Sequence, residues 1–246
     1  MDRLGDGGDY RYERFADYLD TLDETPAATN AAFLVGHSTL RLNSMDDVTR
    51  PAKVGEIAAM AKIVYEAMQC GATGFSTGLI YGPNKAAPTD EIVALAQAAS
   101  DGGGIYVTHM RNEADEIDEA LEETFEIGRR ADLPVVVSHH KCAGKTNHGR
   151  SRETLAHFDR AAKSQKVGLD VYPYNAGSTV ILVEMIDVAE RVIITWSEAR
   201  PEFAGRDLAE IATELGCSAK DAATQLMPGG AIYFMMNEED VQRILT

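Results

Sequence analysis

Hydrophobic residues gather along the chain in short continuous runs, separated by stretches of helical periodicity. The runs lie at residues 31–36, 72–77, 105–110, 133–140 and 167–174. Between the first two runs, Ile57, Met60 and Val64 fall on one face of a predicted helix. Because the runs are continuous and do not alternate with polar residues, they are typical of parallel strands covered by helices. The pattern therefore predicts an α/β fold of successive βα units.

The regular alternation ends after Ala176. Two short helical segments, DLAEIATELG and SAKDAATQLM, are followed there by a strand-like AIYFMM and a helix-like EEDVQRIL. We expect this tail to leave the parallel sheet.

Polar side chains stand where four of the predicted strands end, at His37, His109, His139 and Tyr172. Parallel α/β folds collect their chemistry at this edge. A single histidine there is more commonly a core residue bonded to a backbone carbonyl. His109 and His139, however, are one βα repeat apart, so neighbouring strands about 4.8 Å apart would present both imidazoles to one point. Two such imidazoles predict half of a zinc site.

The neighbours of His139 permit more than one interpretation. His140 follows it directly, so its side chain should face the helix layer on the opposite side of the strand. Cys142 is either a third ligand or, as we favour, a small buried residue. Lys141 shares a face with His139 and either binds a carboxylate as a point charge or pairs with a neighbouring acid.

Composition excludes several classes of partner. The 246 residues, 45% of them hydrophobic, carry 23 Lys and Arg against 39 Asp and Glu, a net charge of −16. This charge would repel nucleic acid and anionic lipid. No basic leader precedes an apolar segment, and no apolar run approaches the roughly 20 residues of a membrane span. We therefore expect a soluble cytoplasmic protein. The three cysteines are few and widely spaced, which favours reduced thiols over a disulfide framework.

Several long motifs carry a resemblance to a known family. The chain resembles the N-acyl-D-amino-acid deacylases (D-aminoacylases) of the amidohydrolase superfamily in LVGHSTLR, GATGFSTGLIYGP, YVTHMRNE, VVVSHHKCAGKTNHGRS, DVYPYNAGST, ITWSEARPEFAGRDLAEIA and IYFMMNEEDVQRIL. The resemblance implies a metal-dependent (β/α)8 TIM barrel and zinc-dependent hydrolysis of the N-acyl amide bond of N-acyl-D-amino acids. A dihydroorotase-like or hydantoinase-like enzyme acting on cyclic amides is the alternative among enzymes.

The resemblance also implies roles for individual residues. His109 and His139 match metal ligands of the family, while Tyr81 matches a residue that lines the substrate pocket. The positions that match groups holding the substrate carboxylate are Lys141, Tyr172 and Ser178.

Parts of the family pattern do not occur in this sequence. An HxH pair and a bridging cysteine would lie upstream, and the catalytic aspartate of a GSDG-type motif would lie beyond Thr246, so we assign no catalytic residue. We expect a partial barrel without its first strands and its last strand. Residues 1–180 would supply βα units for about strands three to seven, and residues 181–246 a helical insertion and the approach to the last barrel strand.

Such a partial barrel leads to further expectations. The chain alone should show little turnover, and its open sheet edges should be covered by the tail or by a second copy in a homo-oligomer. A barrel remnant that binds metal or ligand without catalysis is the alternative outside the enzymes.

Overall fold

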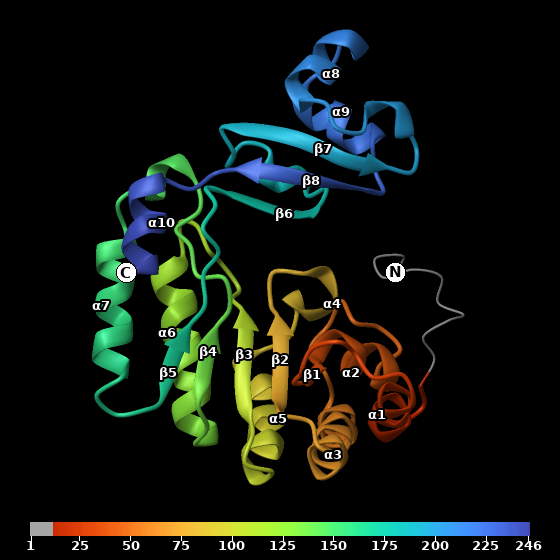
Figure 1. Ribbon diagram of the computed structural model, residues 1–246, viewed down its shortest axis with the longest axis vertical. Helices are drawn as coiled ribbons and strands as arrows, with labels where there is room; N and C mark the ends of the chain where they lie inside the picture. Colours follow the sequence, from red (N-terminus) through yellow and green to blue (C-terminus); the bar gives the residue numbers. More distant parts are fainter. Residues whose placement is uncertain (1–11) are drawn as a thin grey trace. The chain divides into compact units, whose positions relative to one another are not determined.

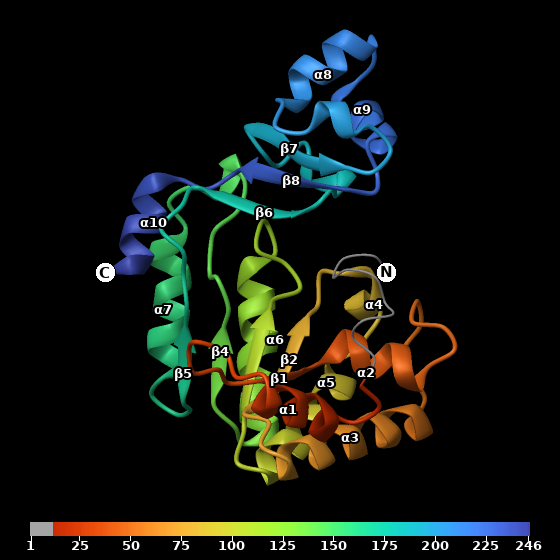
Figure 2. The ribbon, with the colours of Figure 1, turned by 45° about the vertical axis from the view of Figure 1, so that its right-hand side comes forward.

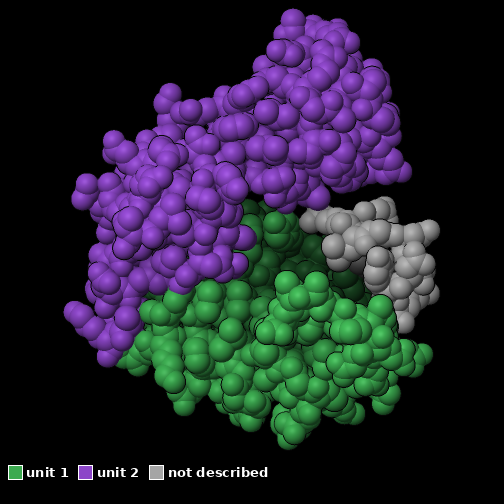
Figure 3. Space-filling model, in the orientation of Figure 1, with its two compact units in different colours: residues 1–111, 123–137, 164–168 green, residues 112–122, 138–163, 169–246 purple. Residues whose placement is uncertain are grey.

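A computed structural model describes residues 12–246 of the chain (Figure 1). The described residues form two compact units, coloured separately in Figure 3. The first comprises residues 12–111, 123–137 and 164–168, and the second comprises residues 112–122, 138–163 and 169–246. Within the described residues, no helix combines the length and apolar character needed to cross a bilayer.

The chain forms a five-stranded sheet with the strands in sequence order. These strands are β1 (Leu34–Gly36), β2 (Gly74–Gly78), β3 (Ile105–His109), β4 (Val135–Val137) and β5 (Val167–Leu169). The pairs β1–β2, β2–β3 and β3–β4 are parallel, and their register sets Gly78 opposite His109 and Thr108 opposite Val137. The predicted fold class, α/β with a parallel sheet of βα units, is confirmed.

Helices separate these strands along the chain. They are α1 (Phe15–Glu24), α2 (His37–Ser44), α3 (Val54–Gln69), α4 (Gly82–Lys85), α5 (Thr89–Asp101), α6 (Ile117–Ala131) and α7 (Ser151–Ala161). Met60 and Val64 of α3 pack with Ile92 of α5 and with Phe75 and Tyr106 of the sheet in a core that excludes water. The helical periodicity in the sequence thus marked the face that is buried.

A three-stranded antiparallel sheet forms in the second unit. Its order is β6-β8-β7, with β6 (Ala176–Val180), β7 (Arg191–Ser197) and β8 (Gly229–Phe234). The sequence indicated β8 as a strand but did not indicate β6 or β7. β6 has the composition AGSTV, without an apolar run, and β7 is buried only at Val192, Ile194 and Ser197.

Short helices complete the second unit. They are the α-helices α8 (Leu208–Leu215), α9 (Ala219–Gln225) and α10 (Glu238–Leu245), and the 3₁₀ helices η1 (Lys145–Asn147), η2 (Val183–Met185) and η3 (Pro201–Phe203). The side chain of Asp207 caps the first turn of α8, and Gly216 ends it with a left-handed residue. Ile211 of α8, Ala222 of α9 and Tyr233 of β8 belong to one buried hydrophobic core. Helix α10 lies beside α7 (Figures 1 and 2).

Candidate metal and carboxylate site

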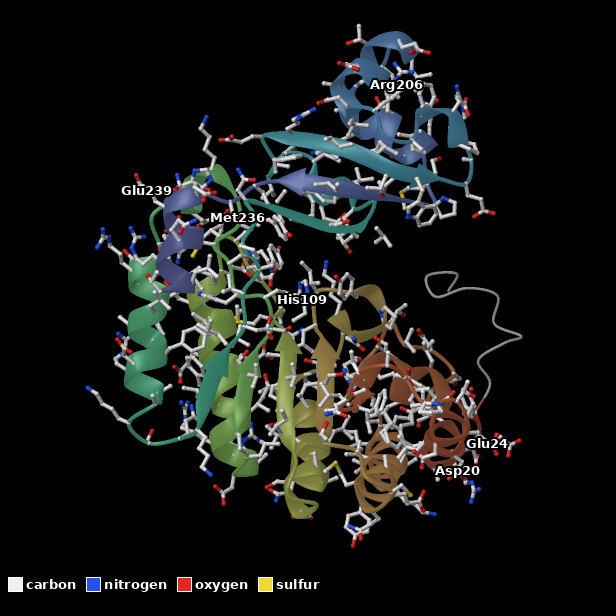
Figure 4. All side chains as sticks on the ribbon, in the orientation of Figure 1. Asp20, Glu24, His109, Arg206, Met236 and Glu239 are labelled. Atoms are coloured by element: carbon white, nitrogen blue, oxygen red, sulfur yellow. The ribbon has the colours of Figure 1, made fainter. Side chains whose placement is uncertain are left out.

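His109 is the last residue of β3 and stands at the carboxyl end of the strand (Figure 4). Its carbonyl oxygen accepts a hydrogen bond of 3.0 Å from the backbone N–H of Leu79. The ring of Tyr81 lies against it, with 5.1 Å between ring centroids. Tyr81 can approach this closely because Gly78 has no side chain; a Cβ there would lie 2.8 Å from the tyrosine ring. The strand end therefore holds two of the predicted site residues together.

His139 follows β4 in an unusual backbone conformation. Its φ is +42°, in the left-handed region that non-glycine residues rarely adopt. Asp170 holds the segment, because its carboxylate accepts the His139 N–H at 2.6 Å and its carbonyl accepts the His140 N–H at 2.8 Å. Local backbone strain costs about 1 to 3 kcal/mol and tends to occur at functional sites.

Glu113, Lys141 and His139 form a compact polar cluster. Oε1 of Glu113 lies 2.7 Å from Nζ of Lys141 and 3.1 Å from Nδ1 of His139, and Nζ lies 2.7 Å from the same Nδ1. Glu113 and Lys141 are buried, whereas the side chain of His139 is 29% exposed. Burial lowers the pKa of Lys141, and the charge of Glu113 opposes that shift. Lys141 thus pairs with a neighbouring acid, which is one of the two roles that the sequence suggested for it.

Tyr172 borders this cluster. Its ring centroid lies 6.3 Å from that of His139 and 5.6 Å from Nζ of Lys141. Its hydroxyl approaches β6 at Gly177, where a Cβ would lie 3.2 Å from the oxygen. Ser178 is the next residue of β6 and is exposed. Because side chains alternate along a strand, Ser178 points to the opposite face from the one that Gly177 turns to Tyr172.

His139 and Glu113 lie in the same compact unit and form a pair of potential metal ligands. Nδ1 of His139 lies 3.1 Å from Oε1 of Glu113. His109 ends β3 in the other compact unit. Imidazole and carboxylate groups are donors that suit zinc.

The sequence did not indicate Glu113 as a site residue. It lies in a loop between β3 and α6, where no periodic pattern distinguishes one acid from its neighbours. The only available signal was its position four residues after His109 in the motif YVTHMRNE.

The other candidates of the sequence analysis lie outside this cluster. His140 faces α7 as predicted, with Nε2 2.9 Å from the Thr154 hydroxyl, and burial lowers its pKa to about 4. Cys142 is buried, and burial raises the pKa of its thiol to about 11, which keeps the sulfur protonated at neutral pH. His37 is buried in an ion-pair network with Glu91 and Arg41 and has a structural role.

Fold and site together define a parallel α/β protein that presents histidines and a carboxylate at its strand ends. No known protein-family profile matches the chain. D-aminoacylase of Alcaligenes xylosoxydans xylosoxydans is 56% identical over 245 residues, which are 100% of this chain and 51% of that protein. N-acyl-D-aspartate deacylase of the same organism is 50% identical over 247 residues, with 100% of this chain and 50% of that protein covered.

Solved structures of such deacylases are also similar to the chain. A crystal structure of D-aminoacylase, described as defining a novel subset of amidohydrolases, matches with a TM-score of 0.95 and 52% identity, over 99% of this chain and 52% of that one. The N-acyl-D-glutamate deacylase of Bordetella bronchiseptica, complexed with zinc and a phosphonate inhibitor, matches with a TM-score of 0.92 and 42% identity, over 95% of this chain and 50% of that one.

The chain belongs to the D-aminoacylase family of amidohydrolases. It spans about half the length of the curated relatives that it matches.

Proposed function

We propose that this chain supplies the zinc-binding and substrate-binding part of an N-acyl-D-amino-acid deacylase. The observation that carries the proposal is the cluster in which a buried lysine, a buried glutamate and a partly exposed histidine meet beside Tyr172. Relatives of this chain are named as deacylases of N-acyl-D-amino acids, and the structure of one such deacylase was solved with zinc.

His109 and His139 are the proposed metal ligands, and Glu113 lies 3.1 Å from His139. Zinc bound there would polarise the amide carbonyl and lower the pKa of a water molecule. The donor set supports zinc over magnesium or calcium, which prefer sites made of oxygen ligands.

Lys141 and Tyr172 are proposed to bind the α-carboxylate of the substrate. The ammonium of Lys141 lies beside the His139 imidazole, so a carboxylate bound by Lys141 would place the neighbouring amide near the metal. Tyr172 supplies a hydroxyl at the border of the cluster, and Tyr81 is proposed to contribute a further contact. Ser178 has no part in this proposal, because its side chain points to the opposite face of β6 from the one turned to Tyr172. The proposed products of hydrolysis are a carboxylate and a free D-amino acid.

Enantiomer preference tests the proposed substrate class. The zinc-loaded chain is titrated calorimetrically with N-acetyl-D-methionine and with its L enantiomer, and release of the free amino acid is followed in the same samples. We expect the D enantiomer to bind at least tenfold more tightly, because the carboxylate and the amide must reach their partners simultaneously. Equal binding of both enantiomers, or binding of neither, would contradict the proposal.

A further inference from the structure

We infer that Glu113 is a positioning residue of the proposed zinc site, whose carboxylate accepts the Nδ1–H of His139 and thereby directs Nε2 of that imidazole to the metal. The inference rests on the proposed function, because it assigns a role within the same site. It starts from the 3.1 Å distance between Oε1 of Glu113 and Nδ1 of His139.

The protons of the cluster allow two arrangements. The Lys141 ammonium has three protons and no lone pair, so it only donates hydrogen bonds. Nδ1 of His139 lies 2.7 Å from this ammonium and 3.1 Å from the Glu113 carboxylate. A neutral imidazole carries one proton, so Nδ1 either accepts from Lys141 or donates to Glu113.

Metal binding through Nε2 selects the second arrangement. A ligating nitrogen needs its lone pair, so the single proton of a neutral imidazole moves to the other ring nitrogen. Glu113 then receives a hydrogen bond from Nδ1–H of His139 and another from Lys141, and a carboxylate has enough lone pairs for both. Metal-bound histidines usually donate their second N–H to a carboxylate or carbonyl in this way.

The backbone of Glu113 is fixed to the segment that carries His139. Its carbonyl oxygen accepts the Ala143 N–H at 2.7 Å, and the side chain of the preceding Asn112 accepts the Ala114 N–H at 2.7 Å. Glu113 is only 8% exposed, so few alternative positions are open to its carboxylate. Carboxylate and imidazole are therefore held in one local framework, which is what a group that orients a ligand requires.

Lys141 completes the arrangement by compensating the charge of Glu113. A buried carboxylate without a partner would be strongly unfavourable, and the ammonium 2.7 Å away supplies the opposite charge. Glu113 thus links the proposed metal ligand to the proposed carboxylate-binding lysine.

Zinc affinity of three variants tests the role of Glu113. The dissociation constant is measured by competition with a chelating dye for the wild-type chain, E113A, E113Q and the control E116A, which changes an exposed acid in the same loop. We expect E113A to weaken zinc binding about 10- to 100-fold. E113Q should weaken zinc binding less than E113A, because its amide oxygen can still accept a hydrogen bond from Nδ1–H of His139. E116A should bind zinc as tightly as the wild type.

A second measurement identifies the tautomer directly and needs no variant. In the zinc-loaded wild type, ¹⁵N chemical shifts of the His139 ring should report a protonated Nδ1 and a metal-bound Nε2. A metal-bound Nδ1, or a wild-type zinc affinity in E113A, would overturn the role of Glu113 and leave the proposed function standing. A wild-type chain that binds no zinc would overturn both.

Discussion

At the residue scale, replacement of Lys141 by methionine tests the carboxylate contact. Methionine keeps most of the apolar length of lysine and removes the charge. Because charged hydrogen bonds contribute about 1.5 to 3 kcal/mol, K141M should raise the dissociation constant for N-acetyl-D-methionine about 10- to 100-fold. Calorimetry on the zinc-loaded chain measures this constant, with K145M, at an exposed position of the same segment, as the control. Equal affinity of K141M and wild type would exclude Lys141 from the substrate contact.

The sequence located the chemistry of the site but not all of its partners. His109, His139 and Lys141 could be singled out because each follows a run of apolar strand residues. Glu113 could not, since its role depends on a loop conformation that brings its carboxylate 2.7 Å from Lys141. The left-handed conformation of His139 could not be predicted either, because it depends on backbone hydrogen bonds that Asp170, a residue on another segment, accepts from His139 and His140.

At the element scale, hydrophobic runs predicted the parallel strands because burial on both faces leaves a simple continuous signal. The antiparallel sheet was harder to foresee. β7 shows only partial alternation and contains a register irregularity between Ile194 and Trp196. β6 is stabilised mainly by its pairing with β8, which is distant in sequence.

The register of β2 and β3, which sets Gly78 opposite His109, requires a glycine at position 74. A Cβ on Gly74 would lie 2.1 Å from the carbonyl oxygen of Ile105, so the two strands would have to separate. We expect G74A to lower the free energy of unfolding by about 1 to 3 kcal/mol. Urea denaturation followed by circular dichroism measures this free energy for G74A and for the wild type.

Gly55 provides the matched control for this prediction. It lies in α3, and a Cβ there would meet nothing within 4 Å. G55A should raise the free energy of unfolding by about 0.5 to 1 kcal/mol, because alanine favours a helix more than glycine. Similar changes in the free energy of unfolding for G74A and G55A would contradict the close approach of Gly74 to Ile105.

At the scale of the whole molecule, the open parallel sheet has a consequence for assembly. β1 and β5 are the outer strands of its order, and a sheet exposes unpaired backbone groups along its outer strands unless something covers them. We propose that a second copy of the chain covers at least one of these edges. The sequence could suggest this from the number of predicted strands, but not which edge is involved.

Light scattering coupled to size-exclusion chromatography tests the proposed assembly. A dimer or larger species should be observed at micromolar concentration, and its dissociation on dilution would be accompanied by a loss of stability. A monomer of 26.7 kDa across the accessible concentration range would contradict the expectation.

Retention of zinc by the purified chain tests the central claim most directly. The wild-type chain, H139A and the control H157A are loaded with zinc, dialysed against metal-free buffer and measured by elemental analysis. His157 lies on α7 beside Asp118 and outside the proposed ligand group. We expect stoichiometric zinc in wild type and H157A and loss of zinc from H139A, while the metal-free wild-type and H139A chains should have similar thermal stability. A wild-type chain without zinc, or an H139A chain that retains it fully, would show that no zinc site is built on His139.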